Sequence, residues 1–194
     1  TYWQQPDRSV MPKVERIQEE KSGIFTEKDG YVSIEAANFS RKNESANVHW
    51  EVIPNLGKTD SGVTTFPQNY YPDSNENIYL EYDFQLESEG EFPVHILASP
   101  TLNFNQNKGL RYAIMVDGQP EQIININEKY DVRKMERWQA KSINQTITKH
   151  NFIKKGKHTL RFRVLEPGIV LQKIMIDTGG LKPSYLGAPE SSRR

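Results

Sequence analysis

Cysteine is absent from the 194-residue sequence, which excludes disulfide bonds, thiolate metal sites and cysteine nucleophiles. An excess of charge of one sign is also lacking, because 25 Lys and Arg side chains balance 25 Asp and Glu side chains. A chain without net charge has no overall field that favours nucleic acid or an anionic membrane. Apolar runs are shorter than the roughly 18 residues of a membrane-spanning helix. We therefore expect neither a nucleic-acid partner nor a membrane span.

The motifs of common catalytic sites are missing too. There is no GxSxG turn, and the four histidines at positions 49, 95, 150 and 158 have no spacing that matches a known nucleophile. Neither phosphate-binding motif, GxxxxGK[ST] or GxGxxG, occurs, and no histidine cluster or EF-hand loop is present. With 25 acidic residues, a pair of carboxylates could always be nominated, so their number does not identify a glycosidase site. The sequence predicts no catalytic residues.

What the sequence does contain is a series of short segments with alternating polarity. The clearest runs from 78 to 86, where every second residue is apolar, and similar patterns cover 31–36, 92–98, 110–116 and 160–164. Weaker strands are expected at 50–53, 62–66 and 122–126. Such spacing predicts an all-β fold, a two-sheet antiparallel β-sandwich of the jelly-roll type. A parallel α/β fold would need long amphipathic helices, and only residues 130–152 could supply one.

The domain boundaries are placed where the alternating segments begin and end. Residues 1–29 are predicted to be a linker with a short helix beginning near Pro12, and residues 30–180 to form the sandwich. The apolar run 169–176 is expected to be a strand buried on both faces. Residues 181–194 form an apolar tail that we expect to pack on the domain or on a neighbour. Because the first residue is Thr1, the chain is expected to be processed or part of a longer protein.

Three long polar loops, 66–77, 101–108 and 127–138, are the places where binding is expected. Exposed aromatic rings stack on the apolar faces of sugars, and polar neighbours bind the hydroxyl groups. The predicted carbohydrate-binding residues are the following: Tyr70, Tyr71, Gln68, Asn69 and Asp73 in the first loop, and Trp138 in the third. The alternative is that these rings close the end of the sandwich or bury against a partner domain.

The segment Tyr31 to Phe39, YVSIEAANF, resembles the opening strand of carbohydrate-binding modules of families 6 and 35. In those modules two acids of an E-A-E pattern and a later Asp hold a structural calcium ion. The resemblance implies calcium ligands at Glu35 and Asp177, whereas Ala37 stands where the second acid would be. One carboxylate fewer weakens a site for a hard cation.

A longer series of motifs resembles the C-terminal domain of family 115 glycoside hydrolases, the xylan α-glucuronidases. The resemblance extends from about residue 31 to 191 and includes Ile53-Pro54-Asn55-Leu56-Gly57-Lys58-Thr59, Gly109-Leu110-Arg111-Tyr112-Ala113, Gly156-Lys157-His158-Thr159-Leu160 and Gly179-Gly180-Leu181-Lys182-Pro183-Ser184-Tyr185-Leu186-Gly187.

This resemblance implies a non-catalytic accessory domain in a secreted or periplasmic enzyme. Its expected partners are the preceding catalytic domains of the same chain, xylan-type polysaccharide and a second copy in a homodimer. The alternative is an independent carbohydrate-binding module that recognises xylan-type polysaccharide through Tyr70 and Tyr71.

Overall fold

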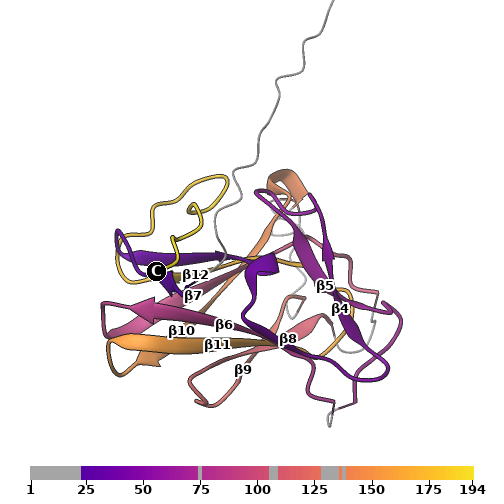
Figure 1. The fold of residues 1–194 in the computed structure, drawn as a ribbon. Coiled ribbons are helices and arrows are strands. Elements are labelled where there is room, and N and C mark those ends of the chain that lie inside the picture. The colour runs from indigo at the N-terminus through magenta and orange to yellow at the C-terminus, as the bar shows by residue number, and fades with distance from the viewer. Residues whose placement is uncertain (1–22, 74–75, 105–108, 128–135, 137–138) are drawn as a thin grey trace, which may run out of the picture.

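The computed structural model describes residues 23–73, 76–104, 109–127, 136 and 139–194, and these form two facing β-sheets (Figure 1). The first sheet has the order β1-β6-β11-β8-β9, with β3 also paired to β6, and the second has the order β10-β7-β12-β5-β4, with β2 also paired to β12. In chain order the strands are β1 Phe25–Thr26, β2 Tyr31–Glu35, β3 Arg41–Asn43, β4 His49–Ile53, β5 Gly62–Phe66, β6 Tyr79–Leu86, β7 Gly90–Ala98, β8 Arg111–Val116, β9 Gln122–Asn125, β10 Asn144–Phe152, β11 Gly156–Val164 and β12 Leu171–Asp177.

Helical structure among the described residues is limited to the 3-10 turn η1 Ala36–Asn38 and to residues 136 and 139–141. None of the described helices is long and apolar enough to cross a membrane. The predicted all-β sandwich is confirmed, and the neighbouring strands pair antiparallel except for the short β1 beside β6.

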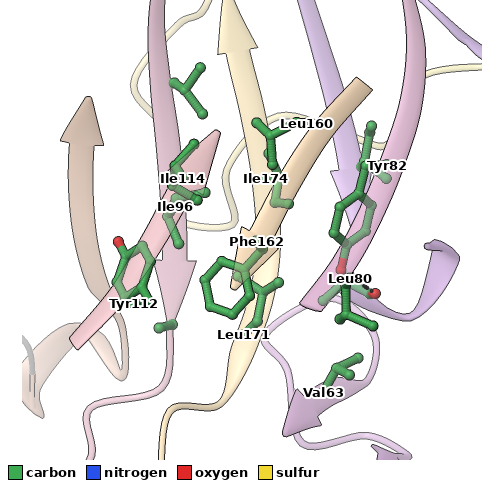
Figure 2. Packing of buried hydrophobic residues seen from close by; sticks show 14 of the residues in the cluster. Val63, Leu80, Tyr82, Ile96, Tyr112, Ile114, Leu160, Phe162, Leu171 and Ile174 are labelled. Carbon is green, nitrogen blue, oxygen red and sulfur yellow. Dashed lines mark hydrogen bonds between the residues drawn. The ribbon is translucent and has the colours of Figure 1, made fainter. Parts of the chain in front are cut away.

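The core lies between the two sheets and is built by the alternation seen in the sequence. In β6 and β11 every second side chain is buried, because successive residues of a strand point to opposite faces. Figure 2 shows Phe162 and Tyr112 from the first sheet facing Ile96 and Ile174 from the second. The buried Tyr82 hydroxyl donates to the carbonyl of Ala36 at 2.8 Å, so this polar atom is satisfied inside the core.

Strand β12 holds the central position that the apolar run predicted. It lies between β7 on one side and β2 and β5 on the other, and every residue except Asp177 is buried. Its inner face carries Ile174 and Ile176 into the core, while Met175 lies on the outer face in a second apolar cluster. The run is therefore a strand buried on both faces, beginning at Leu171 rather than at 169.

Strand β10 occupies much of the segment 130–152, the one that a parallel α/β fold could have used as a helix. Its residues 144–152 pair with β7 along the full length of both strands and do not continue a helix. Thr146, Ile147 and Thr148 are β-branched, which favours an extended backbone. The alternation is obscured because polar Asn144 and His150 point inward and apolar Ile147 points outward.

The N-terminal boundary of the sandwich lies before Gly30, contrary to the expected linker over 1–29. Phe25 belongs to the core, and β1 pairs with β6. The expected helix near Pro12 lies outside the described residues. Residues 181–194, called the C-terminal segment below, run next to β12 in Figure 1. Ser191 exchanges two hydrogen bonds with Ser33 of β2: its N–H donates to the Ser33 carbonyl at 2.8 Å, and its side-chain hydroxyl accepts from the Ser33 N–H at 2.9 Å.

Candidate functional site

In the loop 66–77, which was predicted to bind carbohydrate, the Tyr70 side chain holds the loop in place. The Tyr70 hydroxyl donates to Glu76 Oε2 at 2.8 Å and accepts from Asn47 Nδ2 at 3.1 Å, and the ring packs against the core. Gln68 is similarly engaged, because its Nε2 donates to the Thr65 carbonyl at 2.8 Å. For Tyr70, the structure favours the alternative reading of a ring that closes the end of the sandwich.

Three of the other predicted carbohydrate-binding residues, Asn69, Tyr71 and Asp73, lie in the same loop. Tyr71 is 46% exposed and is the residue of this group that presents a ring to solvent. Asn69 and Asp73 are exposed, and the Asp73 N–H donates to Glu76 Oε2 at 3.0 Å. Trp138 lies outside the described residues.

The two expected calcium ligands are far apart. Glu35 is opposite Lys173 in the pairing of β2 with β12, whereas Asp177 is opposite Tyr31 at the other end of the pair. Four residues of strand separate these positions by about 13 Å. The Glu35 carboxylate accepts from Thr59 Oγ1 at 2.6 Å and pairs with Lys173 Nζ at 2.9 Å. This arrangement does not fit a calcium ion, since a buried ammonium already neutralises Glu35 and no second carboxylate ligand comes from Asp177.

A different site lies between the C-terminal segment and the outer face of β10, β7 and β12. It is a cavity of about 610 Å³, called the tail cavity below. Leu97, Ile143 and Met175 form an apolar floor and are buried, while Leu181 packs against the same cluster. The remaining lining side chains are polar or stand in the C-terminal segment: Lys58, His95, Lys141, Gln145, Asp177, Lys182, Pro183, Ser184, Tyr185 and Ala188.

His95 is one of the residues that line this cavity. Its Nδ1 lies 2.8 Å from Gln145 Nε2, and because an amide nitrogen can only donate, Nδ1 accepts and the proton is on Nε2. Nε2 is buried and has no hydrogen-bond partner among the described residues. Burial lowers the pKa of the His95 imidazole, and the negative charge of Asp177 offsets only part of this, so the ring is neutral at pH 7.

Tyr185 supplies the aromatic surface of the tail cavity. Its ring is 66% exposed, and Lys58 Nζ lies 3.6 Å from the ring centroid and donates to the Tyr185 carbonyl at 2.8 Å. This cation–π contact and hydrogen bond hold the ring at the cavity edge. Burial lowers the pKa of the Lys58 ammonium, and the nearby positive charge of Lys141 lowers it further.

A second cavity of about 520 Å³ lies beside β3, β6 and β11, and the two carboxylates that line it, Asp83 and Asp117, have partners within the protein. Arg41 forms two hydrogen bonds with the Asp83 carboxylate, at 2.6 and 2.7 Å. Asp117 contacts His158 Nδ1 at 2.6 Å and accepts from the Thr159 N–H at 2.9 Å. Within the described ranges no group of three or more His, Asp or Glu residues could hold a metal ion. The two carboxylates of the second cavity are therefore already engaged by protein partners.

Sequence reasoning missed the tail cavity because its residues come from four distant parts of the chain. Lys58, His95, Lys141 and Tyr185 meet only when β7 and β10 pair and the C-terminal segment folds over them. The one local signal was the apolar, aromatic character of residues 181–189 after the last strand.

The fold is a two-sheet β-sandwich like that of a family 35 carbohydrate-binding module, with a cavity on the outside of one sheet. The family model for the glycosyl hydrolase family 115 C-terminal domain matches residues 24–190, and the chain belongs to this family.

Two solved structures show the same fold. One is BtGH115A, described as a family GH115 4-O-methyl-α-glucuronidase with specificity for decorated arabinogalactans, at a TM-score of 0.60 and 14% identity. The match covers 84% of this chain and 18% of that one, so this chain spans less than a fifth of its length. The other is a family 35 carbohydrate-binding module from Clostridium thermocellum, at a TM-score of 0.50 and 16% identity, covering 75% of this chain and 97% of that one. No match was found among curated proteins.

Proposed function

We propose that this chain is the non-catalytic C-terminal accessory domain of a xylan-degrading α-glucuronidase and that it contacts polysaccharide through the tail cavity. The observation that carries the proposal is an exposed aromatic ring, Tyr185, at the edge of a cavity with an apolar floor in a domain of this family.

The non-catalytic assignment is supported by the small number of carboxylates that line the tail cavity. Hydrolysis of a glycosidic bond uses two carboxyl groups about 5 to 9.5 Å apart on either side of the sugar. Asp177 is the single carboxylate among the described residues that line the cavity, and its Oδ1 accepts from the N–H groups of Gly179 at 2.9 Å and Leu181 at 3.1 Å. We therefore assign cleavage of the substrate to other domains of the parent enzyme.

Contact with a polysaccharide is supported by the chemistry of the lining. The Tyr185 ring offers a face on which a sugar can stack, and Gln145 offers hydrogen bonds to hydroxyl groups. The cavity volume of about 610 Å³ falls within the range of small-ligand sites.

Binding and hydrolysis can be tested with the 194-residue chain. In affinity electrophoresis we expect glucuronoxylan in the gel to retard the parent chain and Tyr71→Ala, and to retard Tyr185→Ala much less. Loss of a stacking ring corresponds to about a tenfold weaker affinity. We expect no release of uronic acid when the chain is incubated with glucuronoxylan, and measurable release would reject the non-catalytic assignment.

The loop of Tyr71 gives the alternative, an independent carbohydrate-binding module. Tyr71 is exposed and stands beside the polar Asn69 and Asp73. If Tyr71→Ala abolished retardation while Tyr185→Ala did not, binding would belong to this loop and not to the tail cavity. Equal mobility of the parent chain with and without polysaccharide would reject both sites.

An assembly role completes the proposal. Leu102 and Phe104 are large apolar side chains exposed in one loop after β7, and this is the surface that we propose packs on preceding catalytic domains or on a second copy. Light scattering of the isolated chain and of the parent enzyme would show whether a homodimer forms. We also infer a secreted or periplasmic location, in keeping with an enzyme that acts on plant polysaccharide.

A further inference from the structure

We propose that Lys173 and Glu35, the buried ion pair between β12 and β2, are positioning residues of the tail cavity and that they fix the place of the Tyr185 ring. The inference rests on the proposed polysaccharide contact, because Tyr185 is the ring to which that contact is assigned. Neither Lys173 nor Glu35 is among the described residues that line the cavity, so both act through neighbours that do line it.

Tyr185 lies in a short turn of the C-terminal segment. Ser184 Oγ donates to the Gly187 carbonyl at 2.8 Å and closes this turn around Tyr185. Gly187 has a φ of 78° and lies close to the cavity floor, since a Cβ at this position would be 3.5 Å from Met175 Sδ. The place of the ring therefore depends on what holds the two ends of the turn.

The end of the turn is held by Lys173. Its Nζ donates to the carbonyl of Ala188, a lining residue, at 3.0 Å. Glu35 adds a second contact just beyond, because its backbone N–H donates to Glu190 Oε1 at 2.8 Å. The buried pair thus fixes the chain directly after the turn that carries Tyr185.

The start of the turn is held by the loop between β4 and β5. Lys58 Nζ donates to the Tyr185 carbonyl at 2.8 Å and lies 3.6 Å from the centroid of the ring. The next residue, Thr59, donates its hydroxyl to Glu35 Oε1 at 2.6 Å. The same carboxylate oxygen pairs with Lys173 Nζ at 2.9 Å. Glu35 therefore ties this loop to the lysine that holds the other end of the turn.

These contacts form a closed path that begins and ends at Tyr185 and passes through one buried point. The side chains of Lys173 and Glu35 are 3% and 8% exposed, and a buried ion pair adds little net stability over a neutral pair of the same shape. What the pair supplies is a fixed geometry between two walls from distant parts of the chain. A binding group has to be held to within about 0.5 Å by such supporting contacts.

Two variants each disconnect one wall without changing a lining residue. Thr59→Val keeps the shape of the side chain and removes its hydrogen bond to Glu35. The double variant Glu35→Gln with Lys173→Met keeps an acceptor for Thr59 and removes the donor to Ala188. Thr159→Val is the matched control, because the Thr159 hydroxyl also donates to a carboxylate, that of Asp83 at 2.8 Å, in the other sheet.

NMR of the 194-residue chain gives a readout that needs no ligand. The Tyr185 ring current should shift the ε-methylene protons of Lys58 upfield, because the ammonium group lies over the ring. We expect this shift to be absent in Tyr185→Ala, mostly lost in Thr59→Val and in the double variant, and retained in Thr159→Val.

Affinity electrophoresis in glucuronoxylan then measures the consequence for binding. The affinity of both disconnected variants should fall toward the roughly tenfold loss expected of Tyr185→Ala, whereas Thr159→Val should match the parent chain. Urea unfolding separates position from stability, since Thr59→Val and Thr159→Val each lose one hydrogen bond to a carboxylate and should unfold at similar midpoints. A purely structural role of the Thr59 contact would leave both the Lys58 shift and the affinity unchanged.

The outcomes distinguish this inference from the proposed function. An unchanged Lys58 shift in Thr59→Val and in the double variant would overturn the positioning role and leave the polysaccharide contact intact. A shift lost as expected in a parent chain that glucuronoxylan does not retard would overturn the polysaccharide contact and support the positioning role. Equal losses in Thr59→Val and Thr159→Val would assign the effect to stability and overturn the inference. If the double variant does not fold, Thr59→Val with its control decides the question alone.

Discussion

Replacement of Lys173 by methionine should be the most informative single change for the stability of this domain. Lys173 lies in the central strand β12 with its side chain 3% exposed, and its ammonium pairs with Glu35 Oε1 at 2.9 Å and donates to the Ala188 carbonyl at 3.0 Å. Methionine has a similar length but no charge and no donor. The Glu35 carboxylate, itself 8% exposed, would keep the hydrogen bond from Thr59 and lose its counter-ion.

The expected loss of stability follows from that buried position. Removing one partner of a buried ion pair leaves an uncompensated charge and costs about 3 to 5 kcal/mol. Urea unfolding followed by tryptophan fluorescence would measure the free energy of unfolding, with buried Trp50 as a reporter. For a domain of this size the change corresponds to a fall in Tm of roughly 10 °C.

A double variant tests whether the charge is the cause. Glu35→Gln together with Lys173→Met keeps an acceptor for Thr59 and removes both charges. We expect it to recover most of the lost free energy, because replacing a whole buried pair by neutral groups is often close to neutral. Lys149→Met is the control, since Lys149 is 70% exposed, pairs with Glu91 at 3.4 Å and should change stability by less than about 1 kcal/mol. The reasoning would be refuted if Lys173→Met cost no more than this control.

Three further predictions concern the rest of the sandwich. Burial raises the pKa of Glu81, but the hydrogen bonds from Arg41 and Arg161 outweigh burial and leave this pKa below its ordinary value. Glu81 therefore stabilises the fold above about pH 4.3, and this stability is lost as the pH falls through the lowered pKa. In Glu81→Gln the free energy of unfolding should fall less steeply on acidification than in the parent chain. Neither EDTA nor added calcium should change the Tm by more than about 1 °C, because the Lys173 ammonium is already the counter-ion of Glu35. A rise in Tm of several degrees with calcium would contradict this account. Phe162→Ala should cost about 3 to 5 kcal/mol in urea unfolding, since the ring is fully buried between the sheets, and a loss below 1 kcal/mol would argue against the packing in Figure 2.

The strands that could be predicted are those whose alternation is regular. In β6 and β11 each buried position is Leu, Tyr, Phe, His or Val and each outward position is polar or aromatic, so the period of two is visible in a short window. Strand β10 was not visible in this way, because Asn144 and His150 are buried and Ile147 is exposed. Strands β1 and β3 are two and three residues long and carry too little pattern to detect.

The candidate site could be predicted only in part, for a related reason. Composition directed the prediction to aromatic side chains but could not show the partners that decide their use. Tyr70 is held by Asn47 and Glu76, a hydrogen-bond network that spans 29 residues of sequence, whereas Tyr185 stays exposed beside Lys58. Whether a ring binds a ligand or supports a loop depends on these contacts and not on the residue type.

The sequence by itself determined the two-layer β architecture and the central strand β12, because polarity alternation and apolar runs act over a few neighbouring residues. It also determined the family, since the ordered motifs extend over most of the chain. Only the tertiary structure decided that Lys173 neutralises Glu35 and that Lys58, Lys141 and Tyr185 surround one cavity. The physical reason is that ion pairs and cavities depend on strand register and on the path of the C-terminal segment, which join residues far apart in the chain.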